Sequence, residues 1–438
     1  MLVVLLGFLV VMLVGAFLLA LPISNTDGKW LSVTHAIFWA MNGVCGTGLV
    51  VAPTALSFSW FGQIVLLLLI QFGGLGFMTL ATFVFILIGK RITFKDRLAI
   101  QEALGENHMK GVVRLVRNII IMTAIIEAVG TVLLIPFFCV RNGAIGVWQA
   151  LFNSISAFCN AGFDVCGTVA NPFGSLSDYR GNVGILVIIA ALSILGAFGF
   201  TVINDVLKCR FRFRRYRLHT KIVLCMTPIL MLFGMFFILA SEWNSPAFAG
   251  MNGGQKLLNS MFQAVMASST AGFSSIDQTA MSSSGKILTC ILMFIGSSPG
   301  STGGGIKTTT FALLVLMGAA GLRGKDDVIV AKRTIEMKTC LRAVAVTVLA
   351  TAVIFTGFLL ICATDGDVPT GYVFFETMTA FTTTGLSMSL PPILSPYALY
   401  TLAVVMFIGR LGPLSVGMIF ARQDRSSLKF PTANIMIG

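Results

Sequence analysis

The chain has 438 residues, of which 56% are hydrophobic and only 11% are charged, and its mean hydropathy is +0.92. A soluble domain cannot bury so much apolar surface, so the composition predicts an integral membrane protein. The net charge of +13 is compatible with nucleic-acid binding, but the distribution of the basic residues argues against it.

The basic residues are concentrated in alternate segments between apolar stretches and in the tail. Lys90–Arg117 and Lys208–Lys221 carry seven each, Arg323–Arg342 carries six and the residues after Phe420 carry three, together 23 of the 30. The positive-inside rule places these segments in the cytoplasm and accounts for the excess without a nucleic-acid partner. The opposite side carries acids that form either a cation-attracting vestibule or ordinary solvated loops: Asp27, Asp164, Asp178, Glu242, Asp277, Asp365 and Asp367.

Cysteine and histidine do not indicate a metal centre. The nine cysteines contain no C-x-x-C pair, and the three histidines lie far apart in the sequence. We therefore expect no metal site and no required disulfide, and we interpret Cys159 and Cys166 as free thiols.

Apolar runs of about 20 residues or more predict eight membrane spans. They cover residues 2–23, 61–89, 118–140, 182–206, 221–240, 286–320, 343–363 and 397–420. The first run has neither a basic leader nor a small-residue cleavage site, so we interpret it as a retained span rather than a signal peptide. An even number of spans, together with the basic loops, places both termini in the cytoplasm.

A fixed internal period divides these spans into four units. Gly48, Gly162, Gly272 and Gly385 follow one another at intervals of 114, 110 and 113 residues, and each has a phenylalanine ten residues before it. Because each glycine lies between two spans, the predicted fold is all-α and integral to the membrane, with four tandem span–re-entrant loop–span repeats around one pore. The expected boundaries are 1–95, 96–208, 209–325 and 326–420 for the repeats and 421–438 for a cytoplasmic tail.

The amphipathic run before each of these glycines is too short to cross a bilayer, which predicts a helix that enters the membrane and ends in a turn. Irregular backbone is tolerated where it lines a water-filled path, and glycine permits angles that let successive carbonyls point one way. Four such turns around one axis would form a selectivity filter for a dehydrated alkali cation. The alternative is four glycine caps on ordinary helices. The candidate ion-binding residues are Cys45, Gly46, Thr47 and Gly48; Cys159, Asn160, Ala161 and Gly162; Ser269, Thr270, Ala271 and Gly272; and Thr382, Thr383, Thr384 and Gly385.

The run 286–320 is too long for one span, and its middle is rich in glycine and poor in helix formers. We predict two half-helices joined by an intramembrane loop at Gly296–Gly305. We expect this loop to be a movable gate, because it is held by few apolar contacts while its serines and threonine satisfy freed backbone groups. Arg410 lies within the last span, where a charge is costly unless it faces a cavity or a partner, so we place it opposite this loop. The alternative is an arginine satisfied by helix C-terminal carbonyls. The candidate gate residues are Gly296, Gly300, Ser301, Thr302, Gly303, Gly304, Gly305, Lys307 and Arg410.

Several other features of the spans allow more than one interpretation. Gly73–Gly76 and Gly196–Gly199 could bend a helix, although close packing is the favoured role. Glu127 could pair with a basic loop residue, and Asp205 is expected at the membrane interface.

Two segments of the loop are similar to known motifs, one of a nucleophilic serine and one of a phosphate-binding loop. Gly296–Gly300 matches the G-x-S-x-G pattern of a nucleophilic serine at Ser298. No predicted span contains a histidine to serve as its base, so an intramembrane serine hydrolase is a distant alternative. Gly300–Thr308 is similar to a phosphate-binding loop but fails the pattern, because an isoleucine interrupts the Gly-Lys pair and no strand precedes it.

With these features assembled, the sequence resembles the potassium transporters of the Trk/Ktr/HKT superfamily. The resemblance rests on the four span–loop–span units, the four filter turns, the SSPGSTGGGIKT loop and the FIGRLGP arginine, and it covers nearly the whole chain. Eight spans without additional N-terminal helices are more similar to the bacterial KtrB-type membrane subunit than to the longer TrkH type. The first filter turn departs from the fourth, because it has Cys45 where the fourth has Thr382.

This resemblance implies potassium uptake across a bacterial cell membrane, with K+ held at the four filter glycines and no bound cofactor. It also implies a homodimer with one pore per subunit and a cytosolic nucleotide-binding (RCK-type) ring as regulator. In the plant relatives, a serine in place of the first filter glycine accompanies sodium preference, so Gly48 favours potassium. A sodium-selective or sodium-coupled carrier is the alternative.

Overall fold

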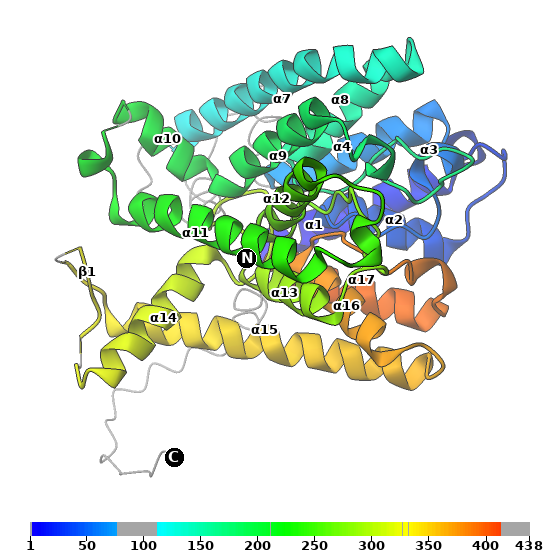
Figure 1. Ribbon diagram of the computed structural model, residues 1–438. Helices are drawn as coiled ribbons and strands as arrows, with labels where there is room; N and C mark the ends of the chain where they lie inside the picture. The colour runs from blue at the N-terminus through cyan, green and yellow to red at the C-terminus, as the bar shows by residue number, and fades with distance from the viewer. Residues whose placement is uncertain (1, 77–111, 211, 326, 332, 413–438) are drawn as a thin grey trace.

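The structure is a computed structural model that describes residues 2–76, 112–210, 212–325, 327–331 and 333–412 (Figure 1). Across these residues an apolar helix, a short helix and a second apolar helix recur in that order. The first helices are α1 (Leu2–Ala20), α7 (Val112–Asn142), α11 (Leu218–Glu242) and α15 (Met337–Thr364). The short helices are α2 (Val33–Cys45), α8 (Ile145–Phe158), α12 (Gly253–Ser269) and α16 (Thr370–Thr382). The second apolar helices are α4 (Trp60–Leu75), α9 (Val183–Phe198), α13 (Ser283–Ile295) and α17 (Pro396–Leu411).

The remaining elements connect these helices. They are α3 (Thr54–Ser57), α10 (Phe200–Lys208), α14 (Thr308–Leu322) and the 3₁₀ turns η1 (Pro22–Ser24), η2 (Ser177–Tyr179), η3 (Phe213–Arg215), η4 (Pro246–Phe248) and η5 (Pro391–Ile393). Between α14 and α15, β1 (Ile329–Val330) pairs antiparallel with β2 (Arg333–Thr334), with Ile329 opposite Thr334. The structure is mostly helical, and the all-α expectation missed only this hairpin among the described residues.

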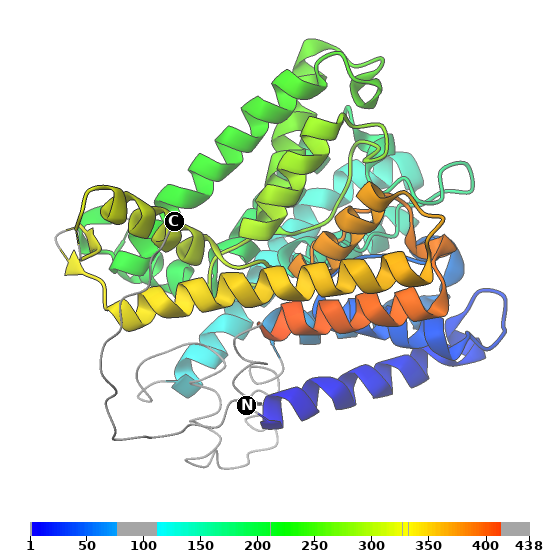
Figure 2. The same cartoon turned by 90° about the horizontal axis from the view of Figure 1, so that it is seen from below.

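The helices close into a ring. Each short helix packs against both apolar helices of its own unit, as α2 does against α1 and α4. The second apolar helix of each unit also packs on the short helix of the next unit: α4 on α8, α9 on α12, α13 on α16 and α17 on α2. The last of these contacts joins the fourth unit to the first, so the four units follow one another around a closed circuit (Figures 1 and 2).

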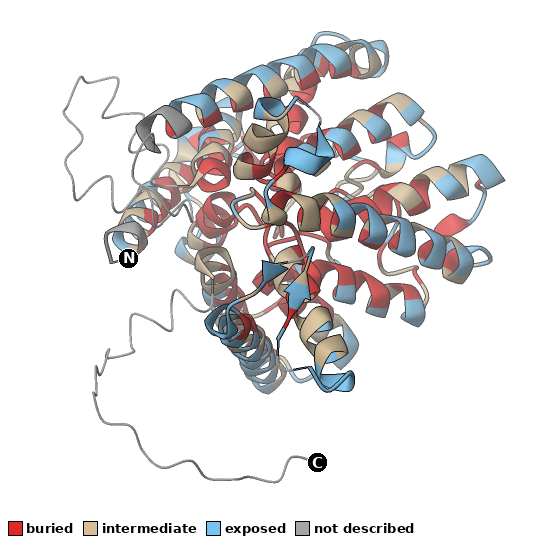
Figure 3. Ribbon diagram, turned by 90° about the vertical axis from the view of Figure 1, so that its left-hand side faces the viewer, coloured by how far each residue is buried: buried red, intermediate tan, exposed pale blue. Residues whose placement is uncertain are grey.

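The side chains divide between an exposed apolar exterior and a buried interior (Figure 3). Outer helices expose large apolar residues such as Phe17 of α1, Val132 of α7 and Phe236 of α11. The C-terminal halves of the short helices are buried almost throughout. Helices that are apolar on their exposed faces suit a lipid environment rather than water.

Three described helices are long and apolar enough to cross a membrane: Val116–Asn142, Leu218–Glu242 and Met337–Thr364. The bent pair α9 and α10 makes a fourth candidate. The other described apolar helices are shorter than the runs that predicted eight spans. The expected spans 61–89 and 397–420 extend into residues outside the described ranges, and the run 286–320 is divided between α13 and α14.

The prediction of one continuous span at 182–206 is wrong. α9 and α10 meet at 92°, and the break is at Gly199, whose φ is 86°. A Cβ at Gly199 would lie 2.8 Å from the carbonyl oxygen of Pro299, and the Phe200 amide donates to the Gly300 carbonyl at 3.0 Å. The bend therefore receives the loop between α13 and α14, which hydropathy cannot reveal because both halves of the run are apolar.

Gly199→Ala is expected to lower the melting temperature of the protein in detergent. A side chain at this φ costs about 1–3 kcal/mol of strain, and the added Cβ also presses on the Pro299 carbonyl. Gly318→Ala within α14 is the matched control, since its Cβ would have nothing within 4 Å and alanine favours a helix. Equal melting temperatures for the two variants would contradict a bend fixed by glycine.

Candidate functional site

Each short helix ends in the same hydrogen-bonded cap. Two residues before each filter glycine the backbone is left-handed, with φ between 48° and 63°, at Gly46, Asn160, Thr270 and Thr383. The next amide donates to the carbonyl five residues back at 2.9–3.0 Å: Thr47 to Asn42, Ala161 to Ser156, Ala271 to Met266 and Thr384 to Thr379. This pattern is a Schellman cap. The left-handed residue of each cap lies two residues before the filter glycine. The filter glycines are therefore not the helix caps.

The four filter glycines have φ values from 69° to 93° and lie against one another's turns. A Cβ built on each would collide with a backbone carbonyl of the following unit: Gly48 with Ala161 at 2.5 Å, Gly162 with Ala271 at 2.9 Å, and, closer still, Gly272 with Thr384 and Gly385 with Thr47. The last collision returns to the first unit, so the contacts form a closed ring. No residue with a side chain fits any of these positions without moving backbone.

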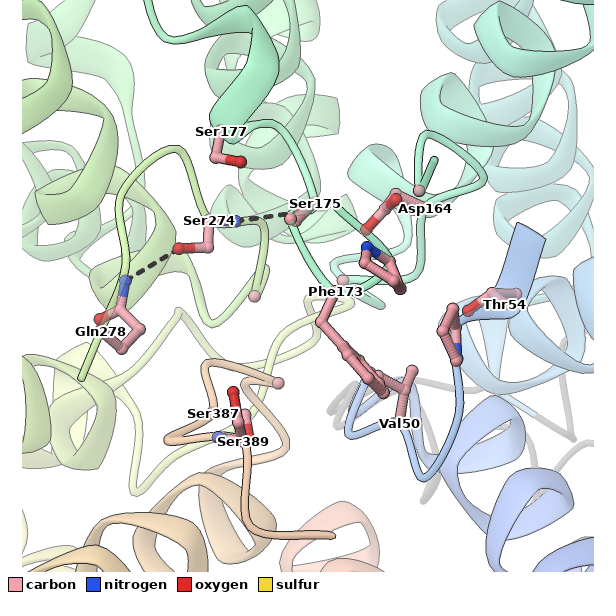
Figure 4. Close-up of a pocket in the computed structure, with 18 of the residues that line it drawn as sticks. Val50, Thr54, Asp164, Phe173, Ser175, Ser177, Ser274, Gln278, Ser387 and Ser389 are labelled. Carbon is pink, nitrogen blue, oxygen red and sulfur yellow. Dashed lines mark hydrogen bonds between the residues drawn. The ribbon is translucent and has the colours of Figure 1, made fainter. Parts of the chain in front are cut away.

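A cavity of about 340 Å³ opens over this ring, and all four filter glycines line it (Figure 4). The close-up shows labelled side chains around it from all four units, including Thr54 of the first and the hydroxyls of Ser274 and Ser387 from the third and fourth. Phe173 extends across the cavity toward Val50. It belongs to the segment 171–180, which lengthens the second unit. The arrangement is a small polar chamber that leads to four backbone turns.

Two of the predicted vestibule acids line this cavity. Asp277 is exposed and accepts hydrogen bonds from the amide and hydroxyl of Thr279. Burial raises the pKa of Asp164 above its ordinary value, although the Cys166 amide and the Ser175 hydroxyl donate hydrogen bonds to its carboxyl. The cavity is therefore lined by one exposed and one more buried carboxyl group.

A polar side chain on each short helix braces the chain that follows the filter glycine, and sequence reasoning missed these residues. Asn42 accepts from the Leu49 amide at 2.9 Å, and Glu376 accepts from the Ser387 hydroxyl at 2.6 Å and the Met388 amide at 2.7 Å. The other two braces join Gln149 to the Val165 carbonyl and Gln263 to Gln278. Other polar residues on the same helices, such as Asn153 of α8 and Asn259 of α12, gave the sequence no means to single these four out.

The loop between α13 and α14 contacts the residues that precede the filter glycines. The Gly304 amide donates to Thr270 Oγ1 at 2.7 Å, and Thr302 Oγ1 donates to the Phe158 carbonyl at 3.0 Å. A Cβ at Gly304 would collide with the carbonyl of Thr382. Since the cavity is lined by the glycines and later residues, the loop occupies the other side of the ring.

The loop is buried and is held by hydrogen bonds of its polar side chains. Ser297, Ser298 and Thr302 are each at most 2% exposed. Asn160 Nδ2 donates to Thr302 Oγ1 at 3.1 Å, in addition to the bonds described above. Thr302 thus bonds to the second filter turn and the helix before it, and Ser298 bonds to the end of α9. Ser297 and Ser301 bond to each other within the loop.

Two positively charged side chains donate hydrogen bonds to backbone carbonyls beside this loop. Arg410 donates to the carbonyls of Thr302 in the loop and of Gly73 in the last turn of α4. Lys307 Nζ donates to the carbonyls of Gly303 at 2.6 Å and Gly304 at 3.3 Å. Arg410 thus lies against the loop and also satisfies a helix-end carbonyl, which combines the two interpretations that the sequence left open.

Comparison with known proteins identifies the family. A family model described as TrkH, cation transport protein, matches residues 8–429. The chain belongs to the TrkH cation transport family. The Ktr system potassium uptake protein B of Bacillus subtilis is 38% identical over 434 residues, which cover 99% of this chain and 95% of that protein. The potassium/sodium uptake protein NtpJ of Enterococcus hirae is 34% identical over 439 residues, covering 99% and 96%.

The fold is similar to that of a solved member. The crystal structure of the potassium transporter TrkH from Vibrio parahaemolyticus matches with a TM-score of 0.72 at 18% identity, covering 95% of this chain and 84% of that one. The resemblance to the Trk/Ktr/HKT superfamily drawn from the motifs is confirmed.

Membership in the TrkH family makes the serine hydrolase alternative wrong, because these proteins are transporters rather than enzymes. Ser298 is 1% exposed and its hydroxyl donates to the carbonyls of Ala197 and Phe198 at the end of α9. Asp205 is likewise structural, because it accepts from the Arg217 amide and the Thr220 hydroxyl and so joins α10 to α11.

Gly385→Ala is expected to abolish cation flux through the protein while leaving its membrane insertion intact. The added Cβ would collide with the Thr47 carbonyl, so the ring cannot keep its geometry. Gly250→Ala is the matched control, since Gly250 has a similar φ of 72° but an added Cβ would meet nothing within 4 Å. Rubidium uptake into proteoliposomes checks both; wild-type uptake by Gly385→Ala would remove this glycine from the conducting path.

Proposed function

We propose that this chain is the membrane subunit of a potassium uptake system in which K+ passes, as in a channel, through the ring of Gly48, Gly162, Gly272 and Gly385. The observation that carries the proposal is the closed circuit of glycine–carbonyl contacts beneath a chamber lined by all four glycines. Backbone carbonyls arranged around an axis can replace the hydration shell of an alkali cation. The name of the B. subtilis relative, a potassium uptake protein, agrees with this choice of ion.

The ion-binding groups in this proposal come from the four filter turns. Thr47 Oγ1, Asn160 Oδ1 and Thr383 Oγ1 are buried and have no hydrogen-bond partner among the described residues. Unsatisfied buried oxygens are rare, and a cation or its water would satisfy them. The four short helices also lead into the turns with their C-terminal ends, which carry partial negative charge.

The proposed architecture is four tandem repeats, with boundaries at residues 1–95, 96–208, 209–325 and 326–420, and eight transmembrane helices around one pore. Its support is the cyclic packing, in which the second apolar helix of each unit contacts the short helix of the next. The basic segments then lie in the cytoplasm together with both termini and the tail 421–438.

The proposed regulation combines the intramembrane gate with a separate cytosolic partner. Gly296–Gly305 together with Lys307 and Arg410 forms the barrier on the far side of the filter from the cavity. An ungated cation pore would dissipate the membrane potential, so a nucleotide-binding ring would control it. This ring would dock on basic segments that include Lys325, Lys332 and Arg333, of which Lys332 lies outside the described residues. The B. subtilis relative is named as part of a Ktr system, which agrees with a multicomponent assembly, and we propose a homodimer of this chain.

A sodium-selective or sodium-coupled carrier is the second candidate, because the E. hirae relative is named as a potassium/sodium uptake protein. Rubidium and sodium uptake into proteoliposomes, measured separately and under imposed sodium and potential gradients, distinguish the two. Rubidium uptake that follows the potential without a sodium gradient supports the channel. A requirement for sodium supports the carrier, and the absence of any flux contradicts both.

Gly48→Ser is expected to lower the ratio of rubidium to sodium uptake. The serine Cβ would lie 2.5 Å from the Ala161 carbonyl, which forces that oxygen out of its place in the ring. Gly28→Ser is the matched control, because Gly28 also has a positive φ but no atom lies within 4 Å of a Cβ built there. If Gly48→Ser keeps the wild-type ratio at normal expression, Gly48 does not line the filter.

Deleting Gly303–Gly305 and, separately, substituting Arg410→Ala are each expected to raise flux and to make it less dependent on the regulator. The deletion removes backbone that lies against the Thr382 carbonyl, and the substitution removes both a positive charge and its bond to Thr302. Arg180→Ala, at an exposed position outside the basic segments, controls for the loss of an arginine. Variants that insert normally but conduct at or below the wild-type rate would show that the loop is a structural linker.

A further inference from the structure

Cys159 differs from its equivalents in the other filter turns. The residue three before each filter glycine is Cys45, Cys159, Ser269 or Thr382. Three of them interact within their own short helix: Cys45 with Met41, Ser269 with the Val265 carbonyl and Thr382 with the Met378 carbonyl. The Cys159 thiol instead lies 3.8 Å from Glu127 Oε1 on α7 and 3.6 Å from Gln71 Oε1 on α4.

These three side chains form a closed network in which Cys159 and Glu127 are buried and Gln71 is partly exposed. Gln71 Nε2 donates to Glu127 Oε2 at 3.3 Å, and Glu127 is 8% exposed. The helix around Glu127 is fixed to the short helix, because Ser154 donates to the Glu127 carbonyl at 2.8 Å. On α4 the absence of a side chain at Gly74 makes room for the thiol, since a Cβ there would lie 2.6 Å from Cys159 Sγ.

A carboxyl group in the apolar interior is costly unless its surroundings satisfy it. Among the described residues, the side-chain partners of Glu127 are Gln71 and Cys159. The pairing with a basic loop residue that the sequence allowed stays a prediction, because most basic residues of the segment 90–117 lie outside the described ranges. Thiol hydrogen bonds are individually weak, so the network adds little stability. What it does is connect the second filter turn to helices of the first and second units.

The network lies beside the contact between the second and first units of the ring. Cys159 is two residues before Ala161, whose carbonyl faces Gly48 of the first unit. We propose that Glu127 is a positioning residue for ion selectivity, which acts through Gln71 and the Cys159 thiol to hold the Ala161 carbonyl at its distance from Gly48. The proposal rests on the proposed filter function and adds a determinant of selectivity outside the filter turns.

The test is the ratio of rubidium to sodium uptake into proteoliposomes of the purified full-length protein. Glu127→Leu and Cys159→Ala are each expected to lower the ratio about tenfold, equivalent to about 1.4 kcal/mol. The double variant is expected to lower it no further, because both changes break one connection. Cys159→Ser and Glu127→Gln, which keep a donor and an acceptor respectively, are expected to retain the wild-type ratio.

Glu242→Gln is the control for perturbing a buried carboxylate. Glu242 is 0% exposed and binds Ser282 at the start of α13, so its loss is expected to lower stability but not the uptake ratio. If Glu127→Leu does not insert into the membrane, the test is the comparison of the uptake ratios of Cys159→Ala and Cys159→Ser. If the wild type is selective and the ratio is unchanged in Glu127→Leu and Cys159→Ala, this proposal alone is overturned. The same holds if the effects of the two substitutions multiply in the double variant. A wild type that carries neither ion overturns the proposed function and this proposal with it.

Discussion

The contact between a filter glycine and the carbonyl of the next unit is the constraint on which the rest of the structure depends. Four turns can meet around one axis only if each presents hydrogen where any other residue has a Cβ. The contact repeats from the fourth unit back to the first, so no unit can move outward without opening the ring. The helical circuit has the same closure, since α17 packs on α2 as α4 packs on α8. The ring of backbone contacts and the ring of helices therefore close in the same way, from the fourth unit back to the first.

Irregular backbone in a membrane interior is stable only where its N–H and C=O groups find partners or line a water-filled path. The Schellman caps satisfy the helix ends, and the side chains of Asn42, Gln149, Gln263 and Glu376 satisfy the chain on the far side of each glycine. These braces use an amide in three units and a carboxyl in the fourth. The backbone is thus nearly four-fold while its supports are not, which allows each edge of the filter to be adjusted separately.

The sequence was informative where backbone geometry demands a residue type and uninformative where side-chain direction decides. Glycine spacing located the four turns, because only glycine fits the ring. The break after Ile295 was predicted from the glycines that follow it, and α14 resumes at Thr308. The glycines at 196 and 199 allowed a bend as the alternative to close packing, but the run stays apolar on both sides of Gly199, so its hydropathy predicts a single span. The partners of Glu127 and Glu376 could not be predicted, since they come from chain segments brought together only by the fold.

The loop between α13 and α14 contacts the filter turns directly, so the proposed gate and the filter are physically connected. Thr302 reaches Phe158 and Asn160 of the second unit, and Gly304 reaches Thr270 of the third and lies against Thr382 of the fourth. Arg410 extends the connection to Gly73 of the first unit. Any displacement of this loop breaks bonds to turns whose carbonyls form the ring. The loop contacts the second, third and fourth units directly and is joined to the first through Arg410. If it is the gate that we propose, its displacement would also change the support of the filter turns.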